Sequence, residues 1–139
     1  MSDADRHGDA NHRDSHPDPL RALAQNEIDP KKSDQDGRLS EAVVAGIKRL
    51  GLMGMQTPRE YGGLDLDMTS YARVMQDVAT YDPSVAVILG AHQSIGMKAL
   101  LLFGTAEQKS KYLPGLAAGE QIAALGAAGA EAELRVCKA

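Results

Sequence analysis

The sequence predicts an all-α fold, built as an antiparallel bundle of helices. Apolar residues recur at intervals of three and four in most segments, which is the spacing of one helix face. No segment shows sustained alternation of apolar and polar residues, so we expect no substantial sheet. The segments between the expected helices are short, and short connections join antiparallel neighbours. A chain of 139 residues fits one domain with a modest hydrophobic core.

The longest expected helix, Asp82 to Gly104, is the element around which the bundle is arranged. Asp82 can cap its N-terminus, Pro83 suits the first helical position, and Gly104 supplies the positive φ common at a helix end. The helix would be roughly 30 Å long. It is apolar on most sides, which is typical of a helix in the middle of a bundle. Polar residues near its centre, His92 among them, argue against a membrane span.

Three shorter helices are expected before the long one. Residues 20–28 fit a short helix, and residues 29–38 fit a loop. Ser40 caps an amphipathic helix that ends at Gly51, and the Gly-rich residues 52–67 fit an irregular connection. Asp67 or Thr69 then starts a further helix. The apolar faces are Val43, Val44, Ile47 and Leu50 in the helix after Ser40, and Tyr71, Val74, Met75 and Val78 in the helix after Asp67.

The remainder of the chain begins with a capping box. Thr105 and Gln108 have the spacing of this motif, so we expect another helix to open there. Pro114 and Gly119 are expected to interrupt regular structure after this helix start. Residues 125–139 are Ala-rich and weakly periodic, and we expect them to be helical or frayed.

Composition argues against several classes of partner. The net charge of −4, without a long basic run, disfavours nucleic acid and anionic membrane surfaces as partners. The single cysteine, Cys137, fits a reducing compartment. Since we recognise no signal or transit peptide, we expect a cytoplasmic location.

The first nineteen residues are polar and rich in Asp and His. They carry too little apolar surface to offset the entropy of ordering, so we expect a disordered tail over residues 1–19. Its histidines, His7, His12 and His16, have no Cys or Glu to complete a ligand set. We therefore expect no metal site.

A reaction centre is not evident from the patterns alone. Asp65 and Asp67 fit turn and cap residues before a helix. Ser94 lies two residues from His92, and residues so spaced do not face each other on a helix. His92, inside an apolar helix, fits a hydrogen-bonded interior residue better than a base or ligand. We expect no catalytic, cofactor-binding or metal-binding residue from these patterns.

Several short stretches nevertheless form a specific set. They are Gly37-Arg38-Leu39-Ser40, Leu50-Gly51-Leu52-Met53-Gly54, Pro58-Arg59-Glu60-Tyr61-Gly62-Gly63, Tyr71-Ala72-Arg73-Val74, Leu89-Gly90-Ala91-His92-Gln93-Ser94-Ile95-Gly96, Leu101-Leu102-Phe103-Gly104-Thr105, Gln108-Lys109 and Lys111-Tyr112-Leu113-Pro114. Together they resemble the N-terminal domain of the acyl-CoA dehydrogenase family, and the Gly90–Gly96 stretch looks most like its very-long-chain branch. The resemblance runs from about Gly37 to Ala124.

This resemblance implies a function. Family members oxidise the α,β bond of acyl-CoA thioesters, transfer a hydride to FAD and pass electrons to an electron-transfer flavoprotein, usually as homo-oligomers. Their catalytic glutamate belongs to a C-terminal domain, and the last two domains hold most of the flavin. The helix matching Asp82–Gly104 walls the acyl cavity. By resemblance and helical spacing, its wall residues would be Ser84, Val87, Ile88, Ala91, His92 and Ile95, and the stripe would leave the cavity by about Gly96.

The resemblance ends near residue 124. Family members continue with a strand of the form Phe-Cys-Leu-Thr-Glu-Pro, whereas this chain reads Leu125-Gly126-Ala127-Ala128. We therefore expect a tail over 1–19, a helical acyl-CoA dehydrogenase N-terminal-like domain over 20–124 and a divergent tail over 125–139. We expect a truncated, long-chain type acyl-CoA dehydrogenase that is inactive alone. The alternative is a non-catalytic helical module that binds a partner or an acyl group.

Overall fold

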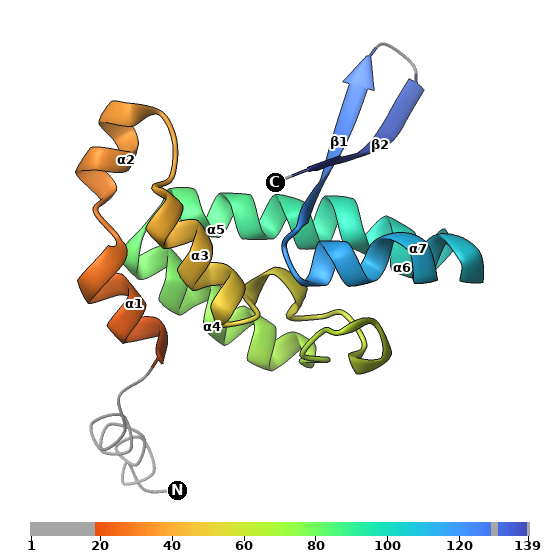
Figure 1. Ribbon diagram of the computed structural model, residues 1–139, viewed down its shortest axis with the longest axis horizontal. Helices are drawn as coiled ribbons and strands as arrows, with labels where there is room; N and C mark the ends of the chain where they lie inside the picture. The colour runs from red at the N-terminus through yellow and green to blue at the C-terminus, as the bar shows by residue number, and fades with distance from the viewer. Residues whose placement is uncertain (1–18, 129–130, 139) are drawn as a thin grey trace, which may run out of the picture.

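The structure is a computed structural model that describes residues 19–128 and 131–138 (Figure 1). The predicted N-terminal tail lies outside the described residues except for Pro19, as do His7, His12 and His16. Most of the described chain is helical, which confirms the predicted fold class. The α-helices are α1 (Pro19–Glu27), α2 (Pro30–Asp36), α3 (Glu41–Arg49), α4 (Met68–Tyr81), α5 (Pro83–Gly90), α6 (Lys98–Phe103) and α7 (Ala106–Ala117).

Shorter elements complete the fold. Two 3₁₀ turns, Leu52–Gly54 and Arg59–Tyr61, lie in the irregular connection between α3 and α4. A π-helical segment, Ala91–Met97, joins α5 to α6 without a break. Strands β1 (Gln121–Ala128) and β2 (Glu131–Lys138) form an antiparallel hairpin that stands out from the helical body (Figure 1).

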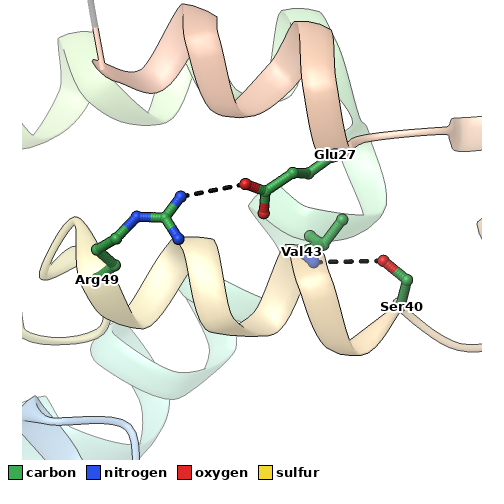
Figure 2. A network of polar contacts seen from close by, with 4 residues as sticks. All are labelled: Glu27, Ser40, Val43 and Arg49. Carbon is green, nitrogen blue, oxygen red and sulfur yellow. Dashed lines mark hydrogen bonds and ion pairs between the residues drawn. The ribbon is translucent and has the colours of Figure 1, made fainter.

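Helix caps account for most of the element starts. The Ser40 hydroxyl accepts the Val43 N–H at 3.3 Å at the start of α3 (Figure 2), and the Asp67 carboxylate accepts the Ser70 N–H at 2.8 Å at the start of α4. Thr105 forms the expected capping box at the start of α7. These three predicted helix starts are confirmed. They could be predicted because local hydrogen bonds, rather than packing against distant residues, determine them.

The expectation of a loop over residues 29–38 is wrong. Most of this stretch forms α2 (Pro30–Asp36), which has no buried residue and so gives no apolar periodicity to detect. Its ends are nevertheless well specified. The Asp29 carboxylate accepts the Lys32 N–H at 3.1 Å, Pro30 is the first helical residue, and Gly37 ends the helix at φ 63°.

The expectation of a helical or frayed end over 125–139 is also wrong. Residues 121–128 and 131–138 pair as strands, from Gln121 opposite Lys138 to Ala128 opposite Glu131. The sequence of β2 alternates polar and apolar residues from Glu131 to Val136, which is the period of a strand. The stretch is short and follows an Ala-rich run, so the alternation is easily overlooked.

The core consists of two adjoining clusters that share the rod from Pro83 to Phe103, formed by α5, the π segment and α6. α5 doubles back along α4, and α7 doubles back along α6 (Figure 1). One cluster includes Val43 and Ile47 from α3 with Leu89 from α5. The other includes Met97 from the π segment and Leu113 from α7. The rod is thus the central element, as predicted.

One detail of the rod's C-terminal end differs from expectation. Gly104 does not adopt a positive φ; it is extended, at φ −68° and ψ 146°. A Cβ there would lie 2.5 Å from the Leu100 carbonyl oxygen. A glycine fits this position because the chain turns tightly against the last helical turn and leaves no room for a side chain.

Candidate functional site: the two sides of the central rod

The rod contains a change of helical register at its centre. The π segment Ala91–Met97 lies between two α-helical parts. Such segments are rare and frequently occur at functional sites. Here the segment carries the polar residues that the sequence places in the middle of an apolar helix, and it directs two of them, His92 and Gln93, into the protein.

The inner side of the rod is anchored by these two buried side chains. Gln93 is 3% exposed, and its Nε2 donates to the Leu52 carbonyl at 2.9 Å. His92 is fully buried, and its Nε2 lies 3.1 Å from the Leu116 carbonyl oxygen. Its Nδ1 accepts the Ala123 N–H at 3.1 Å. The rod is thereby tied to the 3₁₀ turn after α3, to α7 and to β1.

The environment of His92 favours a neutral imidazole. Burial lowers its pKa below the ordinary value of 6.5, while hydrogen bonding to the carbonyls of Leu116 and Met53 opposes this shift. The prediction that His92 is a satisfied interior residue is consistent with both ring nitrogens being hydrogen-bonded. Ser94, by contrast, faces outward and donates to the Gly90 carbonyl of its own helix at 2.6 Å.

The outer side of the rod is apolar and lacks a covering element among the described residues. Val87, Ile88 and Ile95 are 69%, 38% and 47% exposed. Ser84 is also exposed and Ala91 is half-buried. Five of the six wall residues expected from the sequence therefore lie on solvent-accessible parts of the rod. His92 is the exception, since it is buried on the inner side.

Exposed apolar side chains occur further along the rod than the sequence indicates. Spacing predicts a wall stripe that ends by about Gly96, yet Leu102 and Phe103 in α6 are 63% and 84% exposed. The change of register within the π segment is one reason why extrapolation at 100° per residue fails beyond it. A direct signal for Leu102 and Phe103 is absent from the sequence, because the whole run Ala99–Phe103 is apolar.

An open groove of about 500 Å³ lies beside this end of the rod, between α6, α7 and β2. Its polar side chains are Gln108 and Tyr112, and Gln108 is already engaged in capping α7. A flavin needs several donors for its pyrophosphate and its ring, and the described lining offers only two donor side chains, the Gln108 amide and the Tyr112 hydroxyl. Among the described residues no group of three His, Cys, Asp or Glu side chains could hold a metal ion. The lining residues are Ala99, Leu100, Phe103, Gly104, Gln108, Tyr112 and Val136.

The rod is also long and apolar enough to cross a membrane, judged by length and composition alone. A buried core helix of a soluble protein passes the same test. The inner side of this helix is hydrogen-bonded to α7 and β1. This packing supports the prediction that the rod does not span a membrane.

Comparison with known proteins gives the family. The sequence model for "Acyl-CoA dehydrogenase, N-terminal domain" matches residues 13–120. The very long-chain specific acyl-CoA dehydrogenase of Bos taurus mitochondria is 49% identical over 106 residues, which is 76% of this chain and 16% of that protein. The human counterpart is 47% identical over 107 residues, 77% of this chain and 16% of that protein.

Solved structures agree with this assignment. Butyryl-CoA dehydrogenase from Megasphaera elsdenii is 25% identical, with a TM-score of 0.63 over 78% of this chain and 32% of that chain. An acyl-CoA dehydrogenase from Bacillus anthracis, complexed with FAD, is 36% identical, with a TM-score of 0.55 over 74% of this chain and 16% of that chain. The chain spans about 16% of the length of the curated relatives named above. It belongs to the acyl-CoA dehydrogenase family and corresponds to the N-terminal domain of its members.

Proposed function

We propose that residues 20–124 form one wall of the acyl cavity of an acyl-CoA dehydrogenase, and that the outer side of the rod contacts the acyl chain. The observation that carries this proposal is the apolar surface of Val87, Ile88 and Ile95, exposed in a protein of this family. An exposed apolar surface of this kind is typical of a ligand or domain interface.

The proposed reaction is the family's α,β-dehydrogenation of an acyl-CoA thioester. FAD, when bound to a complete enzyme, accepts the hydride, and an electron-transfer flavoprotein takes the electrons. The part that this chain plays is binding and exclusion of water: its apolar side chains surround methylene groups of the substrate. The outer stripe carries no carboxylate, so we propose that the base and the flavin site come from other domains of a homo-oligomeric enzyme.

Long acyl chains are the proposed substrate class. Ser84 and Ala91 are small and lie on the same side of the rod as Ile88 and Ile95. Small side chains at such positions leave depth for a long chain, whereas bulky ones would close the cavity. The similarity to very long-chain specific relatives supports the same choice.

The test is a chimera in which residues 1–124 replace the matching domain of a homologous dehydrogenase. We expect Ala91→Phe to lower kcat/KM on palmitoyl-CoA far more than on butyryl-CoA, because the ring occupies the distal cavity. Ala42→Phe, at an exposed position of α3, is the control and should leave the ratio unchanged. Equal losses on both substrates would show that Ala91 serves helix packing only.

A second measurement concerns the role assigned to this chain alone. A polypeptide of these 139 residues should show no acyl-CoA-dependent reduction of an electron acceptor, even with added FAD. It should bind no flavin with the visible absorption of a flavoprotein. Turnover above that of a mock preparation would contradict the assignment of base and flavin to other domains. The non-catalytic alternative would instead be favoured by acyl binding to this polypeptide together with an inactive chimera.

A further inference from the structure

We infer that His92 is the positioning residue that fixes the start of β1 on the helical body, and that only its neutral form with the proton on Nε2 can do so. The two ring nitrogens face opposite kinds of group. Nδ1 lies 3.1 Å from the Ala123 nitrogen, and Nε2 lies 3.1 Å from the Leu116 carbonyl oxygen. A backbone N–H only donates and a carbonyl only accepts. Nδ1 must therefore carry a lone pair and Nε2 a proton.

A second contact, independent of the imidazole, acts on the same strand residue. Gly96 lies one helical turn after His92, and a Cβ at Gly96 would lie 2.2 Å from the Ala123 Cβ and 2.9 Å from its carbonyl carbon. The rod and the strand can approach this closely only because Gly96 has no side chain. The hydrogen bond from Ala123 and the close contact at Gly96 thus define one docking point for β1.

Among the described residues, no charged group contributes to the pKa of His92: burial lowers it, and hydrogen bonding to the carbonyls of Leu116 and Met53 only partly opposes burial. The 3₁₀ turn Leu52–Gly54 and β1 carry no charged residue. The charged residues nearest in sequence are Lys98 on the rod, Glu107, Lys109 and Lys111 on α7, Glu120 after α7, and Lys48 and Arg49 before the 3₁₀ turn.

Protonation of His92 therefore has a directed consequence. It would place an N–H on Nδ1 opposite the N–H of Ala123, so that two donors face each other in a buried site. Since the pKa of His92 is lowered in the folded protein, the bond is intact above the ordinary value of 6.5 and weakens as the pH falls below it. The start of β1 should then separate from the rod before the helices unfold.

NMR of the full 139-residue chain tests this inference directly. At pH 7.5 the imidazole ¹⁵N signals of His92 should show a bare Nδ1 and a protonated Nε2. The hydrogen-exchange protection of the Ala123 amide, relative to its intrinsic rate, should fall as the pH drops from 7.5 to 5.5. Leu113 in α7 is buried and reports global unfolding, so its amide should stay more strongly protected than that of Ala123 at each pH if the start of β1 separates first. A protonated Nδ1, or a pH-independent protection at Ala123, would overturn the inference.

Two variants distinguish the contribution of Nδ1 from that of Nε2. Asn at position 92 can place an acceptor near the position of Nδ1, and Gln can place a donor near that of Nε2. We expect His92→Asn to keep the Ala123 amide protected and His92→Gln to speed its exchange at least about tenfold, the cost of losing one buried hydrogen bond. Both variants should abolish the pH dependence between 7.5 and 5.5.

The control is Ser94→Ala. Ser94 lies in the same π segment, but its side chain is exposed and donates to the Gly90 carbonyl of its own helix, so its replacement should leave Ala123 protection unchanged. Equal exchange in His92→Asn and His92→Gln would show that the imidazole only fills space. If a variant does not fold, the tautomer and pH profile of the unmodified chain decide the question alone. None of these measurements depends on acyl-CoA binding, so they stand apart from the proposed function.

Discussion

The two sides of the central rod are similarly apolar but have opposite surroundings. On the inner side Val85 and Leu89 are at most 1% exposed, and His92 and Gln93 are hydrogen-bonded to other elements. On the outer side Val87 is 69% exposed, among residues of the same chemical kind. Composition therefore tells how apolar a helix is, but not which side belongs to its own core. The uncovered side is the one that a substrate or another domain can use.

The largest expected difference in the free energy of unfolding is between two leucine-to-alanine substitutions in the rod, one at a buried position and one at an exposed position. Leu89→Ala removes a fully buried side chain, so we expect the free energy of unfolding to fall by about 2–5 kcal/mol. Leu102→Ala removes the same atoms from a side chain that is 63% exposed, so we expect a change within about 0.5 kcal/mol. Urea denaturation followed by circular dichroism measures both. Similar losses would mean that the outer side is covered in solution, for instance by self-association.

The second comparison uses two glycines of the rod. Gly96→Ala should destabilise the fold by about 1–3 kcal/mol, because the new Cβ would overlap Ala123 in β1. Gly90→Ala meets only the Met75 Cε, at an ordinary 3.7 Å, and should stabilise the helix by up to about 1 kcal/mol. Thermal unfolding should thus shift in opposite directions. A shift of the same sign in both variants would mean that β1 does not dock where the structure places it.

The pH dependence should distinguish the inner side from the rest of the molecule. Since the folded state lowers the pKa of His92, the unfolded chain binds more protons near pH 6.5, and stability falls as the pH drops below that value. Asp67 does not contribute in this range, because the hydrogen bond from the Ser70 N–H lowers its pKa below 3.8. Urea midpoints at pH 7.5 and 5.5 should therefore differ in the unmodified chain and converge in His92→Asn. An undiminished difference in that variant would assign the effect to another group.

How far the sequence predicts this molecule depends on the range of the interactions involved. The starts at Ser40, Asp67 and Thr105 are predictable because each cap bonds a backbone N–H three residues away. α2 escapes prediction since it has no buried side, although Asp29, Pro30 and Gly37 mark its ends. The hairpin escapes it since β1 is rich in Ala and Gly, and pairing with β2 creates the strand.

The candidate site is predictable to the same extent: local helical spacing can be read from the sequence, whereas contacts between distant residues cannot. Helical spacing places Ser84, Ile88, Ala91 and Ile95 on one side of the rod, and the structure exposes or half-exposes all four. Spacing cannot show that His92 belongs to the opposite side, because its orientation depends on Leu116 and Ala123, more than twenty residues away. The π segment is another feature that spacing cannot reveal, since its change of register accompanies the packing of His92 and Gln93.

The smallest expected effect lies away from the rod, at the contact between α1 and α3. The Arg49 guanidinium lies 3.1 Å from the Glu27 carboxylate, with the two side chains 62% and 25% exposed (Figure 2). Such pairs contribute little, because water and salt screen the charges and ordering two long side chains costs entropy. We expect Glu27→Gln to lower the free energy of unfolding by less than about 1 kcal/mol, and the difference to shrink in 1 M NaCl.

Ser40→Ala is the matched comparison, because it removes one neutral hydrogen bond from the start of α3 without changing any charge. Its loss should be about 1 kcal/mol and should not depend on salt. A salt-independent loss in Glu27→Gln that exceeds that of Ser40→Ala would contradict a screened surface pair. It would instead indicate that the Glu27 side chain helps to pack α1 on α3. A Cβ built at Gly46 of α3 would lie only 2.9 Å from the Glu27 Oε2. The helical body would then depend on α1 more strongly than its exposed ion pair suggests.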